Sequence, residues 1–451
     1  MSTLVKPFRG WRYNPERVGD LASVMAPPYD VISLPQQAEF CLRSPYNIVH
    51  LDLGEPAGPG IGDPRRYTQA AEVLRQWQAD GVLLRDPAPA FYLYEEQYTD
   101  PLGVARTQRG ILGAVELHPY EDRVVLPHEG TLKGPKLDRL ALMEACEVAF
   151  SQIFALYSDP DLTVEKITDG VVAETPYFDI NDGAGLRHRL WVISDPAPVA
   201  AISAALQDRQ IVIADGHHRY ETALAYREEY RAAHSVGAAH GVDPEAPAER
   251  VTMFLANTQS SELTIVAAHR MLQKLPRGTW DRLATCPVRP FSVATVVLSA
   301  GSDAEVARTM VEMLDRWKDR AIAFLAYGRE RSAYLLLMDK QAPPPAGYGE
   351  GHSETWKRLG VAVLHNLLMP EVLGLTGSYA ESGENVTFTR YAEEAVALVE
   401  AGKQEMALLL NPTGVDEVMA IAQAGDKMPQ KGTYFYPKLL AGIVLYDLAT
   451  H

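Results

Sequence analysis

An apolar run, one glycine and a helical pattern follow each other directly in this chain, and together they constrain its fold more than any other feature. Residues 213–224 read IADGHHRYETAL. The run 210–214 (QIVIA) is typical of a buried strand, and residues 220–234 repeat apolar positions with a helical period. Gly216 stands at the turn between them. The stretch predicts a strand, a tight turn and a helix, which is a building unit of α/β proteins.

Strand and helix patterns also alternate along the rest of the chain. We expect strands at 90–98, 109–117, 151–158, 188–194 and 263–272, and helices at 63–86 and 303–319. The 451 residues exceed what one hydrophobic core typically accommodates. The pattern of predicted strands and helices also changes near residue 288. We therefore predict an N-terminal α/β domain over 1–287, which contains the DGHHR stretch. A C-terminal α/β domain over 288–451 would contribute the segment MPQKGTYFYPK.

The charge balance limits the classes of partner. The chain has 42 Lys and Arg against 58 Asp and Glu, a net charge of -16. Such a balance disfavours a protein that coats nucleic acid or an anionic membrane, but it leaves room for a small anionic ligand in a local basic pocket. The three cysteines, Cys41, Cys146 and Cys286, show no zinc or redox spacing. With no apolar run of about 18–20 residues and no signal-like start, we expect a cytoplasmic protein.

The turn after the 210–214 run carries groups suited to phosphate chemistry. The start of a helix offers backbone donors and the positive end of a dipole, which favour a phosphate or carboxylate, and Gly216 lets the backbone approach such an anion. Arg219 would add a bidentate clamp, and His218 is suited to proton transfer. Asp215 would hold Mg²⁺ or accept a proton. The alternative is an Asp215 that only caps the helix, beside surface histidines.

A second polar segment, 126–142, reads LPHEGTLKGPKLDRLAL. Glu129 is a candidate general base, and three cations in the segment are candidate phosphate ligands. The segment's candidate residues are His128, Glu129, Thr131, Lys133, Lys136 and Arg139. The alternative is an ordinary polar loop in which Asp138 caps the following helix.

A third polar segment covers 428–445, where lysines alternate with aromatic residues in a strand-like run. Its candidates are Lys431, Thr433, Tyr434 and Lys438. Aromatic side chains in such a run more often pack in a hydrophobic core than bind a ligand. The lysines are harder to explain as core residues. Near the N-terminus, the pair Pro27-Pro28 precedes Tyr29 and Asp30, as in a rigid ligand loop or turn. No Walker A, Rossmann glycine, GxSxG or HExxH motif occurs.

These segments together resemble a known family. APPYDVIS, SPYNIVHLDLGEP, LPHEGTLKGPKLDRLAL, IADGHHRYETAL and MPQKGTYFYPK look like the DUF1015 family of uncharacterised bacterial and archaeal proteins, from about residue 5 to 446. The DGHHR stretch is also similar to the phosphate-binding motif of the ParB/sulfiredoxin-like superfamily. Its members include sulfiredoxin, CTP-hydrolysing ParB proteins and free-serine kinases. The kinase motif Asp-Gly-x-His-Arg corresponds to Asp215, Gly216, His218 and Arg219.

The resemblance implies a fold and an activity. It implies a mixed α/β (α+β) fold with a ParB/sulfiredoxin-like nucleotide-binding core and an additional mixed-sheet C-terminal part. We expect a nucleotide-dependent phosphotransferase that uses ATP or ADP with Mg²⁺ and a small hydroxylated acceptor, with free L-serine as the first candidate. The alternatives are a ParB-like nucleotide switch and a phosphodiester hydrolase. A nucleotide and a small molecule are the expected partners, nucleic acid and membrane are not, and a homodimer is left open.

Each candidate residue receives a role under this hypothesis. The catalytic residues would be Asp215, His218 and Glu129, with Asp215 also the metal ligand. The substrate-binding residues would be Tyr29, Asp30 and Tyr434. The nucleotide- or phosphate-binding residues would be Gly216, His217, Arg219, Tyr220, His128, Thr131, Lys136, Arg139, Lys431, Thr433 and Lys438. In the kinases a glutamate activates the serine hydroxyl, and Glu129 is chosen for that role by its chemistry.

Overall fold

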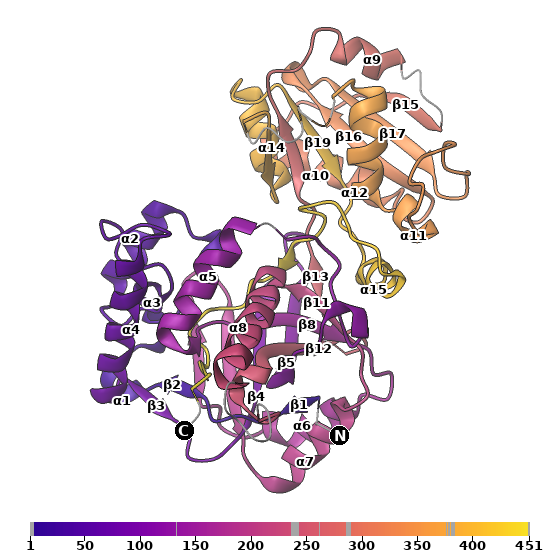
Figure 1. Cartoon of the computed structure of the whole chain (residues 1–451). Helices are drawn as coiled ribbons and strands as arrows, with labels where there is room; N and C mark the ends of the chain where they lie inside the picture. The colour runs from indigo at the N-terminus through magenta and orange to yellow at the C-terminus, as the bar shows by residue number, and fades with distance from the viewer. Residues whose placement is uncertain are drawn as a thin grey trace. The chain divides into compact units, whose positions relative to one another are not determined.

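The computed structural model describes residues 4–131, 133–235, 243–260, 262–285, 290–375, 377, 379 and 384–449. Contacts divide the chain into two compact units (Figure 1). The first unit comprises Met1–Pro127, Thr131–Thr264 and Pro437–His451, and the second comprises His128–Gly130 and Ile265–Tyr436. The contacts thus divide the chain at 264–265 rather than near 288. Strand β14 (His269–Leu272) lies inside the second sheet, and the C-terminal segment returns to the first unit.

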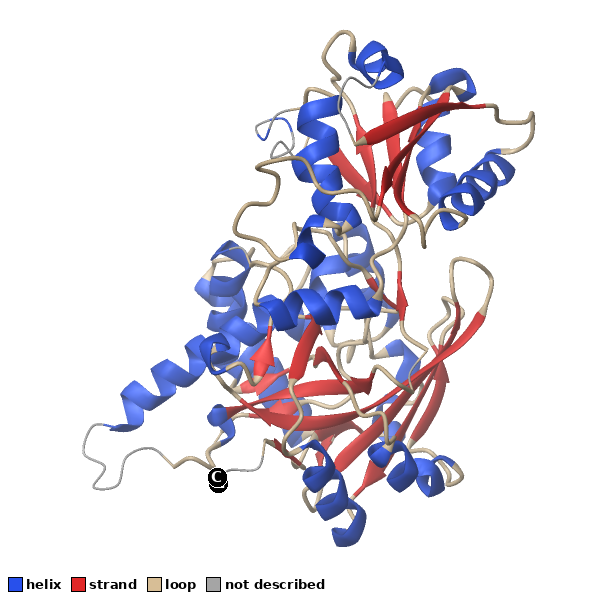
Figure 2. Ribbon diagram, turned by 90° about the vertical axis from the view of Figure 1, so that its right-hand side faces the viewer, coloured by secondary structure: helices blue, strands red, loops and turns tan. Residues whose placement is uncertain are grey.

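The first unit is built on a nine-stranded sheet with the order β6-β11-β8-β12-β5-β4-β10-β9, to which β1 adds by pairing with β5. Figure 2 shows these strands as one curved sheet. The strands are β1 (Val5–Lys6), β4 (Phe91–Thr99), β5 (Ala105–Glu116), β6 (Val125–Leu126), β8 (Ile153–Tyr157), β9 (Phe178–Asn181), β10 (Arg187–Ile193), β11 (Ile211–Asp215) and β12 (Arg250–Asn257). The pairs β11–β6 and β12–β8 are parallel, and the other pairs are antiparallel.

Apolar side chains on alternate strand positions place one face of this sheet against helices. The alternation is visible in β8, where Ile153, Ala155 and Tyr157 all join one core. Helices α6 (Thr163–Val172), α7 (Pro196–Leu206) and α8 (His217–Ser235) contribute to the same core. Helix α5 (Lys133–Cys146) packs against both α8 and α4 (Pro64–Ala79). The apolar face of the sheet, which repeats every two residues, therefore packs against the apolar faces of the helices in one buried layer.

Most of the expected elements are present. The runs 90–98 and 109–117 form the β4–β5 hairpin, and the helix expected over 63–86 is α4, with an Asp63 cap and Pro64 in its first turn. The strand expected over 263–272 is instead two short strands, β13 (Thr264–Ile265) and β14, which belong to different sheets. The aromatic run of the third polar segment contains only the two-residue strand β20 (Phe435–Tyr436).

The second unit is a six-stranded sheet between two helical layers. Its order is β15-β17-β16-β19-β14-β18. Its strands, besides β14, are β15 (Phe291–Val296), β16 (Ala321–Tyr327), β17 (Ala333–Asp339), β18 (Val386–Thr389) and β19 (Met406–Leu410), and neighbouring strands pair antiparallel.

The central strand β16 shows why this sheet is covered on both faces. Phe324 and its alternate neighbours join one core with the π-helical segment η6 (Leu364–Val372), and Leu325 and its alternate neighbours join another core. Helices α10 (Asp303–Asp315) and α14 (Ala392–Glu400) line that second core. A strand buried on both faces reads as a continuous apolar run, which AIAFLAY is. The expected mixed α/β class is confirmed.

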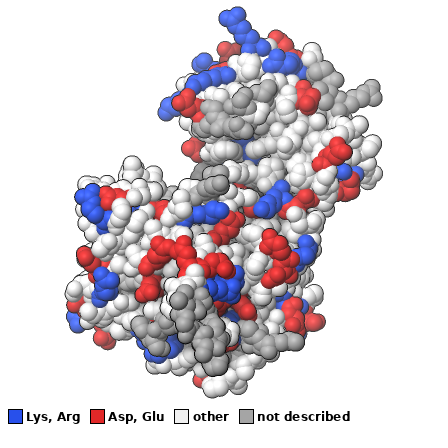
Figure 3. Space-filling model, viewed as in Figure 1, with Lys and Arg blue, Asp and Glu red and all other residues white. Residues whose placement is uncertain are grey.

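Acidic and basic side chains are interspersed on the face seen in Figure 3. Within the described part of the chain, no helix is both long enough and apolar enough to cross a bilayer.

Candidate functional site

The turn between β11 and α8 has a backbone that only glycine adopts readily. Gly216 has a φ of +93°, in the left-handed region. A Cβ at this position would lie 2.9 Å from both Nε and Nη2 of Arg219. The missing side chain therefore permits both the sharp reversal and the folding of the Arg219 side chain back over the turn.

Asp215 and Lys438 meet at this turn, although they are far apart in sequence. The Asp215 Oδ1 atom lies 2.7 Å from Lys438 Nζ, and its Oδ2 atom lies 3.2 Å from Arg219 Nη2. Burial by itself would raise the pKa of Asp215, but the charges of Lys438 and Arg219 prevail and lower that pKa to about 2. The third polar segment thus delivers one of its lysines to the DGHHR turn, within the first unit.

The contacts of Asp215 do not fit the metal-ligand role expected from the sequence. Each carboxylate oxygen already accepts from a cation, Lys438 on one side and Arg219 on the other. A bound Mg²⁺ would bring a third cation, with two further positive charges, to the same carboxylate and would have to displace one of these partners. The carboxylate is better suited to holding Lys438 in place.

Arg219 secures the turn to the neighbouring strand. Its Nη1 atom donates to the backbone oxygen of Gln152 and lies 3.2 Å from Ser151 Oγ, immediately before β8. With Nη2 engaged by Asp215, both terminal nitrogens already have protein acceptors. The bidentate phosphate clamp expected for Arg219 is therefore not its role in this conformation.

A small cavity beside Arg219 brings together candidates from three of the polar segments. Tyr29, Arg139 and Arg219 all line this space of about 50 Å³. The Arg139 guanidinium lies 4.2 Å from the centre of the Tyr29 ring. The volume suits one or two water molecules and lies far below the roughly 300 Å³ of a typical ligand pocket. In this conformation the cavity is too small for a nucleotide, and Asp30, beside it in sequence, is exposed.

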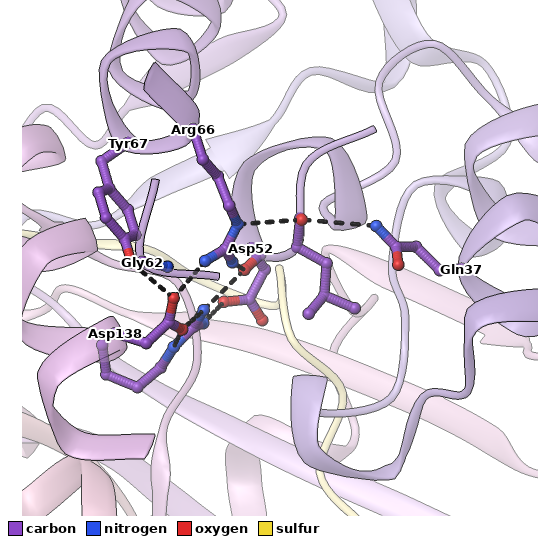
Figure 4. A network of polar contacts seen from close by, with 8 residues as sticks. Gln37, Asp52, Gly62, Arg66, Tyr67 and Asp138 are labelled. Atoms are coloured by element: carbon purple, nitrogen blue, oxygen red, sulfur yellow. Dashed lines mark hydrogen bonds and ion pairs between the residues drawn. The ribbon is translucent and has the colours of Figure 1, made fainter. Parts of the chain in front are cut away.

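Arg139 belongs to a buried network of ion pairs, part of which Figure 4 shows. Its Nη1 atom lies 2.5 Å from Asp52 Oδ1, and its Nε atom lies 2.8 Å from Asp138 Oδ2. Arg66 also binds Asp138, and Tyr67 donates to it across 2.8 Å. Two buried carboxylates thus balance two buried guanidiniums, so the phosphate-binding role predicted for Arg139 is replaced by a structural one.

Two further candidates converge on a residue that the sequence did not single out. Thr131 Oγ1 lies 2.6 Å and Lys136 Nζ 2.5 Å from Glu221 Oε2. Glu221 stands four residues after His217 on α8, so both share one helix face. The four-residue spacing between His217 and Glu221 in IADGHHRYETAL was the sequence signal that could have identified Glu221. The side chain of the remaining lysine in the segment, Lys133, lies outside the described residues.

Tyr220 is a core residue rather than a ligand. It is fully buried, and its hydroxyl donates to the His118 backbone oxygen and accepts from the His118 N–H. Its ring stacks on Tyr120 at 5.5 Å. The two histidines differ in burial, since His217 is buried and His218 is half-buried.

The second unit holds the remaining candidates. The buried His128 lies with Nε2 2.9 Å from Thr433 Oγ1, and Glu129 Oε1 accepts from the Lys431 N–H at 3.4 Å. The Tyr434 hydroxyl contacts Arg390, whose guanidinium lies 5.2 Å from the centre of the Tyr434 ring. The short stretch His128–Gly130 is thereby joined to the segment 431–434 within this unit.

Fold and site together define a two-unit α/β protein with a cation-rich turn between a strand and a helix. The chain belongs to the DUF1015 family, described as "Protein of unknown function", whose model matches residues 5–362. The family resemblance expected from the sequence is confirmed. No curated protein matches the chain.

Several solved structures are similar to this one. A free serine kinase in complex with AMP is 13% identical, covers 69% of this chain and 83% of its own, and has a TM-score of 0.33. The protein SbnI with a C-terminal truncation, from Staphylococcus aureus, is 11% identical, with coverages of 73% and 85% and a TM-score of 0.33. A conserved hypothetical protein from Pyrococcus furiosus is 13% identical, with coverages of 69% and 87% and a TM-score of 0.31.

Proposed function

We propose that this protein is a nucleotide-dependent phosphotransferase that phosphorylates a hydroxyl group of a small metabolite. The observation that carries the proposal is the meeting of Asp215, Arg219 and Lys438 at the start of α8. Two cations and one carboxylate leave one net positive charge beside the positive end of a helix dipole. Such a place favours a phosphate group.

Some residues would fix the conformation of the turn, and others would bind the phosphates. Asp215 positions Lys438, and Arg219 holds the turn against β8, so that the first backbone amides of α8 keep one orientation. Lys438 and those amides would donate to the phosphates. Mg²⁺ that arrives with the nucleotide would neutralise phosphate charge, as in other phosphoryl transfers. Positioning and charge supply most of the catalysis in this class of reaction.

The proton of the acceptor hydroxyl needs a base with a pKa near neutrality. Asp215 is unsuited to this role because its pKa is held near 2. His218, which matches the kinase motif and lies on the same helix as Arg219, is the candidate for the base, whereas Glu129 belongs to the second unit. Free L-serine is the first acceptor to test, because the DGHHR stretch carries all the fixed positions of the free-serine kinase motif.

The test is phosphate transfer by the purified full-length chain. With Mg²⁺ and ATP or ADP, we expect phosphoserine, or the phosphorylated form of another acceptor from a panel of hydroxylated metabolites, detected by mass spectrometry. His218→Gln should lower kcat about 100-fold or more, in the range typical of general acid–base catalysis. His234→Gln is the matched control, since His234 lies exposed on the same helix.

The negative outcomes are also informative. If no acceptor of the panel is phosphorylated, the phosphotransferase proposal fails, even if nucleotide binds. Nucleotide hydrolysis without an acceptor would favour the switch alternative. Cleavage of a phosphodiester that survives loss of nucleotide binding would favour the hydrolase.

A further inference from the structure

Three metal-ligating side chains of different chemistry meet near the N-terminus of the first unit, and none of them belongs to the DGHHR turn. They are Cys41 on α2 (Leu34–Arg43), His50 on α3 (Val49–Asp52) and Glu55 in the loop that follows. One ligand atom of each lies within 4.8 Å of the other two. In the described part of the chain this is the only group of three or more such residues that close together.

The hydrogen bonds of His50 orient its Nδ1 atom toward the Glu55 carboxylate. Nε2 lies 3.1 Å from the backbone oxygen of Ser44, and because a carbonyl only accepts, Nε2 carries a hydrogen. Nδ1 lies 2.6 Å from Glu55 Oε1. Two acceptors at this distance repel each other unless a proton lies between them. A metal ion can take the place of that proton once the two atoms separate enough for bonds of about 2.0 Å each. The carbonyl contact at Nε2 is also the usual partner of a metal-binding histidine.

The backbone around these ligands is held by partly buried hydrogen bonds. Gln37, one helical turn before Cys41 on α2, donates to the Gly54 oxygen across 2.8 Å. Arg66 Nε donates to the Leu53 oxygen across 3.1 Å, as Figure 4 shows. The backbone immediately before Glu55 is thereby held from two helices. A ligand set on such a fixed frame loses little entropy when it binds an ion.

We propose that Cys41, His50 and Glu55 bind one divalent ion of the Zn²⁺ class, with a water molecule as fourth ligand. A sulfur, a nitrogen and an oxygen donor suit Zn²⁺, whereas Mg²⁺ and Ca²⁺ take oxygen ligands. The exposed Glu55 gives the ion a path from solvent. On binding, the ion replaces the thiol proton and the proton between His50 and Glu55, and both protons pass to water. This site is independent of the proposed phosphotransferase function.

The test uses the full-length chain, stripped with a chelator and titrated with Co²⁺. We expect one equivalent to bind, with the near-ultraviolet charge-transfer absorption of a Co²⁺–thiolate bond, and Zn²⁺ to displace it. Cys41→Ser should abolish that absorption and weaken binding at least about 100-fold, since loss of outer partners alone costs 10–100-fold. Glu55→Gln should also weaken binding. Glu39→Gln, an exposed carboxylate on the same helix, is the matched control and should bind as the wild type does.

Two results would overturn the proposal: the absence of stoichiometric Co²⁺ and Zn²⁺ binding, or equal binding by Cys41→Ser. A measurement on the unmodified sequence guards against misfolded variants. One equivalent of Zn²⁺ should slow alkylation of the half-buried Cys41, mapped by peptide mass spectrometry. An alkylation rate of Cys41 that does not change with Zn²⁺ would contradict the site without any substitution.

Discussion

Gly216 adopts a left-handed backbone conformation in the turn of the candidate site. Replacing it with alanine places a Cβ in the left-handed region and 2.9 Å from the Arg219 guanidinium. We expect Gly216→Ala to lower the free energy of unfolding by about 1–3 kcal/mol and to displace Arg219 from the turn. Urea unfolding measures the first effect.

The control for this substitution is Gly103→Ala. Gly103 also has a positive φ, +83°, but a Cβ there would meet no atom within 4 Å. It should cost about 1–2 kcal/mol, the backbone contribution alone. Equal costs for the two variants would show that the packing of Arg219 over Gly216 is unimportant.

A buried histidine makes stability depend on pH. Burial alone would lower the pKa of His188, but Asp182 and Glu96 raise it to about 9. Because the folded pKa is higher than the unfolded value of about 6.5, the stabilisation is complete below pH 6.5 and is lost as pH rises through 9. The free energy of unfolding should fall by on the order of 2 kcal/mol across that window.

His188→Gln should flatten this slope in urea unfolding, while His118→Gln, which replaces a more exposed histidine, should keep it. An unchanged slope in His188→Gln would refute this account.

At the scale of elements, buried ion pairs join α3, α4 and α5. Asp138 accepts from Arg66, Tyr67 and Arg139, so Asp138→Asn leaves two buried guanidiniums short of a charge partner. We expect a loss of about 3–5 kcal/mol in unfolding free energy, because breaking a buried pair exposes the desolvation cost of the other ion. Asp179→Asn, which removes a largely exposed pair with Arg187, should cost about 0–1 kcal/mol. Similar losses from both would contradict the structural role given to the network.

The elements were largely predictable from the sequence, while contacts between them were not. The β4–β5 hairpin and the β11–α8 turn follow from local periodicity, which one segment carries by itself. The prediction of one strand over 263–272 is wrong because the apolar pattern continues across a break between two sheets. The contact of Asp215 with Lys438, and the neutralisation of Arg139 by Asp52, depend on long-range packing that no local pattern encodes. The sequence therefore predicts local elements better than the contacts on which the role of each candidate residue depends.

At the scale of the whole molecule, each unit carries its own core, and the C-terminal segment belongs to the first. Strand β21 (Tyr446–Asp447) pairs with β7 (Val148–Ala149), and Leu445 is fully buried. We expect Leu445→Ala to cost about 2–5 kcal/mol and to speed hydrogen exchange in β7 and β8.

The matching substitution in the other unit is Leu409→Ala, at a fully buried position of β19. It should speed exchange in β16 and β19 instead, because its contacts belong to the second unit. Peptide-resolved exchange that rises in the same strands for both variants would contradict two separate cores.

The central claim is that the Asp215–Lys438 pair at the start of α8 forms a phosphate site. Calorimetric titration of ADP with Mg²⁺ into the wild type and Lys438→Met tests it most directly, with Lys6→Met as a control that removes a lysine paired elsewhere. We predict that Lys438→Met weakens ADP binding about 10–100-fold, the loss of one or two charge-assisted hydrogen bonds, and that Lys6→Met leaves it unchanged. Wild-type protein that binds no nucleotide, or Lys438→Met that binds as tightly as the wild type, would contradict the claim.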